Sequence, residues 1–157
     1  MARDTADTKS TADAPTRHPG LKALDKLVGT WKIEGETPGE ITYRWMEGGF
    51  FLLAQADVKQ AGVRQGHIEI IGYDRGAGAT KSSDTMTSRL YTTRGDTLDY
   101  THEVDDKTVT SWFGEKGSPS VFKARWSEDG NTLSGEWVWP GGGYKLTLTR
   151  VKPTTKR

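Results

Sequence analysis

The feature that most constrains this chain is a hydrophobic period of two, which returns in about ten short segments between residues 29 and 151. In the first segment, Trp31 and Ile33 alternate with Lys32 and Glu34. Such alternation is typical of strands that bury one face. Turn sequences such as Asp129-Gly130 separate the segments, and no interval is long enough for a crossover helix. The pattern therefore predicts an antiparallel sheet in which consecutive strands pair.

Ten strands in a meander leave two free edges, which invite pairing with other molecules. A closed barrel removes both edges, whereas a two-sheet sandwich is the other solution, and the number of strands alone does not separate them. The ends of the pattern favour closure, because Gly29-Thr30-Trp31 opens the first strand and Arg150 closes the last. We therefore predict an all-β fold, a single antiparallel up-and-down β-barrel of about ten strands.

A short helix is expected before the first strand. Leu21, Leu24, Leu27 and Val28 lie at helical intervals, and Gly29 follows where a helix would end. One or two helical turns cannot bury these leucines alone. We therefore expect the helix to pack across an end of the barrel.

Aromatic residues mark the extent of the folded domain. The chain of 157 residues contains 6 Trp, 5 Tyr and 4 Phe, all between Trp31 and Tyr144. Large rings allow a core to form although the hydrophobic fraction is 33%. We predict a disordered tail over residues 1–19, in which His18 has no role, a barrel over 20–151 and a flexible C-terminal tail over 152–157.

Charge and cysteine content exclude several classes of function. The net charge of +1 gives no general attraction to nucleic acid or to an anionic membrane, so neither is expected as a partner. The absence of cysteine excludes disulfides and thiolate sites. No apolar run approaches the ~20 residues of a membrane span, and the N-terminal segment lacks the apolar stretch of a secretory signal. We expect the protein to be located in the cytoplasm. The sequence does not decide whether it forms a homodimer.

Gly29, Trp31 and Arg150 together resemble the signature of the calycin superfamily, which contains the lipocalins and the fatty-acid-binding proteins. The segments 27–31, 47–51 and 72–74 resemble most the bacterial DUF1579-like and nitrobindin-like branch. The resemblance covers residues 20–151. It implies that Arg150 packs over the Trp31 indole as a cation–π contact of ~1–2 kcal/mol that closes one mouth of the barrel.

Parity along the strands then predicts which side chains point inward. If Trp31, Leu148 and Arg150 face the interior, their neighbours at even spacing do too, whereas the faces of 50–58 and 107–113 are ambiguous. Large aromatic walls with a few polar groups are typical of ligand pockets. The residues predicted to line a binding cavity are Tyr43, Trp45, Tyr100, His102, Phe122, Trp126, Trp137, Trp139 and Tyr144.

This interior supports three hypotheses about function. The first is binding of a small hydrophobic or aromatic molecule in the cavity. The second is an enzyme, since the resemblance includes cyclases and isomerases that use a cavity to shape a reactive substrate. In that case His102, Tyr100 and Tyr43 are the acid–base candidates, with Asp84 or Glu69 as further ones. The third is an interaction module in which the rings simply fill the barrel.

Metal and cofactor sites are not expected. His67 and Glu69 share one strand face, but His-x-Glu alone is a weak metal signal. The resemblance to nitrobindin-like proteins implies haem held by a histidine late in the barrel, and this chain has no histidine after His102. Haem is therefore disfavoured, with Tyr144 or an atypical use of His102 as the remaining ligands.

Overall fold

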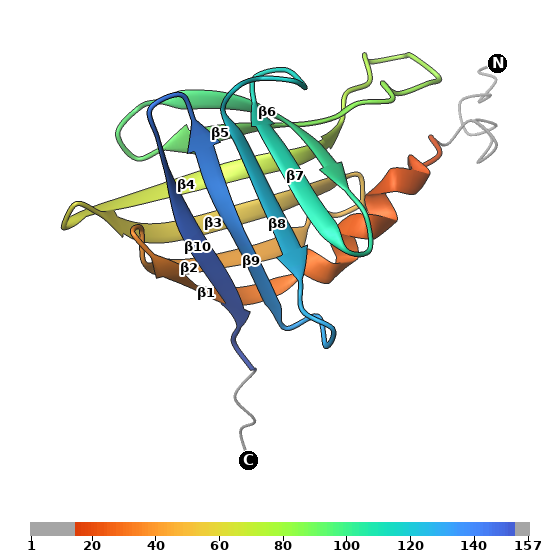
Figure 1. Cartoon of the computed structure of the whole chain (residues 1–157). Coiled ribbons are helices and arrows are strands. Elements are labelled where there is room, and N and C mark those ends of the chain that lie inside the picture. The colour runs from red at the N-terminus through yellow and green to blue at the C-terminus, as the bar shows by residue number, and fades with distance from the viewer. Residues whose placement is uncertain (1–14, 153–157) are drawn as a thin grey trace, which may run out of the picture.

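The computed structural model describes residues 15–152, and within them ten strands form one closed antiparallel barrel (Figure 1). The predicted fold class is confirmed. The strands are β1 (Gly29–Gly35), β2 (Gly39–Trp45), β3 (Phe51–Gln60), β4 (Val63–Tyr73), β5 (Met86–Thr92), β6 (Thr97–Val104), β7 (Thr108–Phe113), β8 (Val121–Trp126), β9 (Thr132–Trp139) and β10 (Gly142–Arg150).

Each strand pairs with its neighbours in sequence, and β1 closes the ring by pairing with β10. Trp31 lies opposite Arg150 and Ile33 opposite Leu148 in this closing pair. Every backbone edge is thereby paired, which explains why so short a chain can carry ten strands without an exposed sheet edge. The closed antiparallel barrel is also consistent with the calycin-like fold that the sequence suggests.

A 3-10 helix, η3 (Pro19–Leu27), precedes β1 and lies across one end of the barrel (Figure 1). In a 3-10 helix, side chains three residues apart lie in one row. Leu21, Leu24 and Leu27 follow this spacing, and all three are buried. The helix predicted from these leucines is present, and their interval of three matches the 3-10 period.

His18 packs against the barrel at the start of η3. Its ring stacks on Tyr73 with 3.7 Å between centroids, and its Nδ1 accepts a hydrogen bond of 3.0 Å from the Gly20 backbone N–H. The sequence analysis gave this histidine no role, whereas here it caps the helix. The rest of the predicted tails, residues 1–14 and 153–157, lies outside the described residues.

The barrel end beneath η3 is closed by contacts around Trp31, which is fully buried. The Arg150 guanidinium lies 4.2 Å from the centre of the Trp31 ring. It also donates hydrogen bonds of 2.7 Å each to the carbonyls of Lys26 and Val28, and the Trp31 indole donates to Leu27 at 2.8 Å. Arg150 therefore joins the last strand both to the first strand and to the C-terminal end of the helix.

The interior faces of the two ambiguous strands follow from the register. On β3 the inward side chains are Leu52, Ala54 and Ala56, and on β7 they include Val109 and Ser111. Within residues 15–152, no helical segment has the length and hydrophobicity that a membrane span requires.

Strand β4 reverses the usual distribution of polar and apolar side chains. His67 and Glu69 point into the barrel, whereas Ile68 and Ile70 lie on its outer face, 45% and 39% exposed. Tyr91 of β5 pairs with Ile68 on that outer face and is also exposed. A strand normally buries its isoleucines, so the inward histidine and glutamate need a separate explanation.

Candidate functional site

The barrel encloses a cavity of about 480 Å³. Its floor is formed by Leu24 and Leu27 of η3. From there it extends to Thr37, Gln60 and Trp139, which belong to the turns and strand ends opposite the helix. Trp139 lines the cavity and is 39% exposed, so this side is the open end of the barrel.

Aromatic rings form much of one wall of the cavity. Trp137 is the centre of this group, with its ring 5.4 Å from Phe122 and 5.9 Å from Tyr100. Trp139 and Tyr144 make a second edge-on pair at 5.9 Å near the open end. The rings are supplied by strands β6, β8, β9 and β10, whose alternation turns every second side chain inward. The wall thus offers flat apolar ring surfaces, together with the indole N–H and phenol O–H groups that can form hydrogen bonds.

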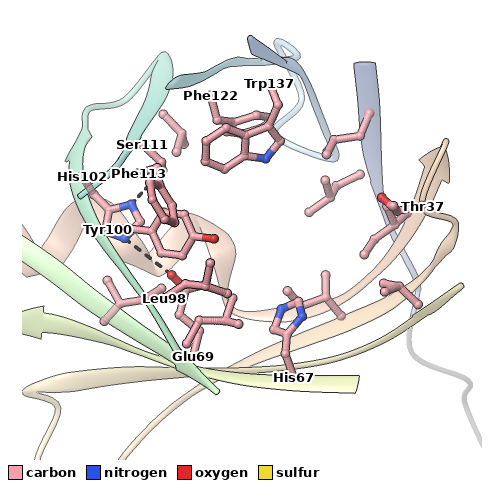
Figure 2. A pocket seen from close by; sticks show the side chains of 18 of the residues that line it. Thr37, His67, Glu69, Leu98, Tyr100, His102, Ser111, Phe113, Phe122 and Trp137 are labelled. Carbon is pink, nitrogen blue, oxygen red and sulfur yellow. Dashed lines mark hydrogen bonds and ion pairs between the residues drawn. The ribbon is translucent and has the colours of Figure 1, made fainter. Parts of the chain in front are cut away.

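A chain of polar side chains faces these rings from strands β4 to β7. Ser88 Oγ donates to Glu69 Oε2 at 2.5 Å and lies 2.7 Å from His102 Nε2. His102 Nδ1 lies 2.7 Å from Ser111 Oγ, and its Nε2 is 3.6 Å from Glu69 Oε2. We call Glu69, Ser88, His102 and Ser111 the polar cluster. In Figure 2 the Glu69 and Tyr100 side chains meet in the same space, with Trp137 and Phe122 across the cavity.

Hydrogen-bond valence assigns most of the protons in the polar cluster. A serine hydroxyl has one hydrogen, and that of Ser88 is donated to the Glu69 carboxylate. Ser88 Oγ can therefore only accept from His102 Nε2, which must carry a hydrogen. In the neutral imidazole, Nδ1 then accepts from the Ser111 hydroxyl. Each short contact of the cluster is thus satisfied when His102 is uncharged.

Burial and charge shift the pKa values of the groups around Glu69. Burial raises the pKa of Glu69, but the hydrogen bonds and charge of His102, with the Ser88 hydrogen bond, outweigh it and hold the pKa below its usual range. Burial, together with the Glu69 charge, raises the pKa values of Tyr43 and Tyr100, so both phenols keep their protons. Burial also lowers the pKa of His67, although the Glu69 charge opposes this. The site at neutral pH therefore combines an ionised carboxylate with uncharged phenols and an uncharged His67.

The cavity brings together seven of the nine side chains predicted to line it. These are Tyr43, Tyr100, His102, Phe122, Trp137, Trp139 and Tyr144. Trp45 and Trp126 do not line the cavity, because they lie at the helix end of the barrel. The Trp45 indole donates to Asp25 at 2.9 Å, and Trp126 is buried with its ring 5.6 Å from Trp31. The alternation of side chains along a strand predicts which of them point inward. It does not predict how far along the barrel axis each of them lies.

Of the additional acid–base candidates, Glu69 joins His102 and Asp84 does not. Asp84 lies between β4 and β5 with its side chain 87% exposed, 3.5 Å from His18. The sequence analysis missed Ser88 and Ser111, which connect His102 to Glu69 and to β7. Serine carries no hydrophobic signal, and the inward face of the strand that contains Ser111 could not be assigned from the sequence.

The residues suggested as haem ligands do not fit that role. Both ring nitrogens of His102 are engaged by serine hydroxyls, which leaves no lone pair directed at the cavity. Burial raises the pKa of Tyr144 and so disfavours the phenolate that binds iron. Within residues 15–152 there is also no group of three or more histidine and acidic side chains placed to hold a metal ion.

Comparison of the chain with protein-family models and with curated proteins gives no match. The barrel, its cavity and the polar cluster are therefore the grounds on which function has to be argued.

Proposed function

We propose that the barrel binds a small, mainly aromatic molecule in its cavity, with one polar group directed at the polar cluster. The support comes from a cavity of about 480 Å³, within the range of roughly 300–1,000 Å³ typical of small-molecule sites. Aromatic rings cover one side and hydrogen-bonding groups are gathered on the other. This division suits a ligand with a flat apolar body and a single polar end.

The observation that carries the proposal is the space left between Trp137 and Glu69. If the rings served only to fill the barrel, large side chains would occupy this volume, because protein interiors pack at the density of organic crystals. Instead a buried carboxylate and two tyrosines face the space. Burying such groups is costly unless they are used or paired.

The same proposal includes a family and a location. The Trp31–Arg150 contact and the closed ten-stranded meander support membership of the calycin superfamily, and the segments 27–31, 47–51 and 72–74 support the DUF1579-like and nitrobindin-like branch. We place the protein in the cytoplasm, which the absence of cysteine supports.

Native mass spectrometry of the full chain purified from its own host tests the binding function, followed by thermal shift with a library of small aromatic compounds. We expect a retained molecule or a compound that raises Tm, because a ligand that binds the folded state stabilises it. Leu98→Trp, which narrows the cavity, should abolish the shift. Leu53→Trp, on the outer face of β3, should preserve it. A bare protein that no compound stabilises would contradict the proposal.

The polar cluster also favours a second function, acid–base catalysis on a cavity-bound substrate. Glu69 would take a proton from one atom of the substrate and return it to another, and His102, through Ser88, would hold the carboxylate in place. A cyclisation or isomerisation fits best, since the cavity would supply the shape of the product.

Incubating the protein with a small-molecule extract of its host tests this second function. Mass spectrometry should show a compound that is consumed and an isomer that accumulates. His102→Ala should slow the conversion by orders of magnitude, whereas a binding protein would show only altered affinity. Equal conversion by wild type and by both His102→Ala and Glu69→Gln would exclude catalysis by the polar cluster.

A further inference from the structure

We propose that the ligand carries a protonated amine, which donates hydrogen bonds to the Glu69 carboxylate while its apolar body lies against the aromatic wall. This inference rests on the proposed binding function and names the chemical class of the ligand. It is carried by the charge of the cavity and by the geometry of Glu69.

The side chains that line the cavity give it a negative charge. Among the described residues that line it, Glu69 is the one carboxylate, and there is no lysine or arginine. His67 faces the same space, and its lowered pKa leaves it uncharged at neutral pH. Among these lining residues the fixed charge is therefore that of Glu69, and its nearest ionisable neighbour is His102, 3.6 Å from Oε2.

One oxygen of Glu69 is free for a ligand. The Ser88 hydrogen bond and the close approach of His102 both involve Oε2. Within residues 15–152, no hydrogen bond reaches Oε1, although an ionised carboxylate accepts about four. The Glu69 side chain is 13% exposed, and it lines the cavity. Oε1 is thus an acceptor on a largely buried side chain, and within the described residues it receives no hydrogen bond.

The hydrogen bonds of the polar cluster engage Oε2 of Glu69 and leave Oε1 to a ligand. His102 satisfies both serine contacts in its uncharged form, with Nε2–H donating to Ser88 and Nδ1 accepting from Ser111. No hydrogen bond of the cluster requires an imidazolium. An ammonium group at Oε1 would form a charge-assisted hydrogen bond in a place where water is largely excluded, and there a charge pair is stronger than in bulk water.

The rest of the cavity suits a cation and disfavours an anion. The faces of Trp137, Tyr100 and Tyr43 present electron-rich surfaces that attract an ammonium group or the methylenes beside it. A carboxylate ligand, such as a fatty acid, would be placed beside the Glu69 charge without an arginine or lysine to bind it. The cavity therefore discriminates among ligands by charge as well as by shape.

Isothermal titration calorimetry with three indoles of similar size tests the inference. Tryptamine, tryptophol and indoleacetate share the ring and carry an ammonium, a hydroxyl and a carboxylate. We expect tryptamine to bind at least about tenfold more tightly than tryptophol, the value of one hydrogen bond to a charged group, and indoleacetate to bind most weakly. Glu69→Gln should remove the advantage of tryptamine over tryptophol. Glu40→Gln, at an exposed position on β2, should have no effect.

The outcomes separate this inference from the function on which it rests. Binding of tryptophol without a preference for tryptamine would overturn the inference and leave the binding function in place. Failure of all three indoles to bind, together with a negative library screen, would reject both. If Glu69→Gln does not fold, the ranking of the three indoles on the wild-type protein still decides the question.

Discussion

At the scale of single residues, Ser88 determines how Glu69 and His102 interact. The two ionisable side chains come from β4 and β6, and Ser88 lies on β5 between them. Its hydroxyl donates to one and accepts from the other, so two groups 3.6 Å apart are joined without direct contact. Small hydroxyl residues between buried polar groups are easily overlooked, yet they decide whether such a network is satisfied.

Ser88→Ala should destabilise the protein by about 1–3 kcal/mol, because it leaves a buried carboxylate and an imidazole without their shared partner. Ser120→Ala is a matched control, since that side chain also lines the cavity and its hydroxyl makes no hydrogen bond within residues 15–152. Urea unfolding of both variants measures the difference. Equal stability of the two variants would show that the bridge contributes nothing.

His67 predicts a dependence of stability on pH. Its pKa in the folded protein lies below the ordinary value of 6.5, mainly because of burial. As the pH falls below 6.5, the unfolded chain binds a proton that the folded protein resists, so the free energy of unfolding decreases. His67→Gln cannot take up this proton.

Chemical unfolding of wild type and His67→Gln between about pH 7.5 and pH 5.5 tests the effect. We expect the wild type to lose stability relative to the variant as the pH decreases. The other ionisable groups are the same in both proteins and cancel in the comparison. Parallel curves would show that His67 is not perturbed by burial.

At the scale of elements, Arg150 joins three parts of the chain that are distant in sequence. Arg150 is the last residue of β10, and its guanidinium covers Trp31 of β1. It donates hydrogen bonds to the carbonyl of Lys26 in η3 and to that of Val28 just after the helix. A lysine would retain the charge but not the fork of donors that reaches two carbonyls at once. The helix is therefore attached to the barrel by a planar cation as well as by its buried leucines.

Arg150→Lys should lower the free energy of unfolding by about 2 kcal/mol, through loss of the hydrogen bonds to Lys26 and Val28. Arg125→Lys, at an exposed position of β8, is the matched control. Thermal unfolding followed by circular dichroism distinguishes the two. A similar Tm for both variants would indicate that the leucines alone attach the helix.

The elements also show which parts of this structure could be predicted from sequence. Alternation located most of the strands and turn sequences separated the others, whereas the Trp31–Arg150 pair indicated closure. Glu69 was named as a further acid–base candidate, but the sequence left open which face of its strand points inward, because Ile68 and Ile70 occupy the face opposite to His67 and Glu69. Its parity was clear, but ordinary burial preferences favour the opposite face.

At the scale of the whole molecule, the two ends of the barrel differ. One end is closed by η3 with Trp31 and Trp126 beneath it, and the other is lined by Trp139, which is partly exposed. Trp137 lies in the cavity between them. The tryptophans therefore lie at different depths along the barrel axis. A signal from each indole would show at which depth a ligand binds.

NMR of the six indole N–H groups tests this asymmetry with tryptophol as the probe. We expect the resonances of Trp137 and Trp139 to shift on titration and those of Trp31 and Trp126 to stay in place. Single Trp→Phe variants assign the signals. Shifts confined to Trp31 and Trp126 would place the bound probe outside the cavity, at the end that the helix covers.

The outward isoleucines of β4 have a consequence for how the barrel assembles. A slip of β4 by one residue against both of its neighbours would turn Ile68 and Ile70 inward and move Glu69 to the surface. That mispaired barrel would have isoleucines in place of His67 and Glu69, but it would expose Ile71, which is buried in the native barrel. The native pairing survives this competition with help from the tight turn at Ala61 and Gly62, where both residues have positive φ. The hairpin thus helps to fix the register in which His67 and Glu69 face the cavity.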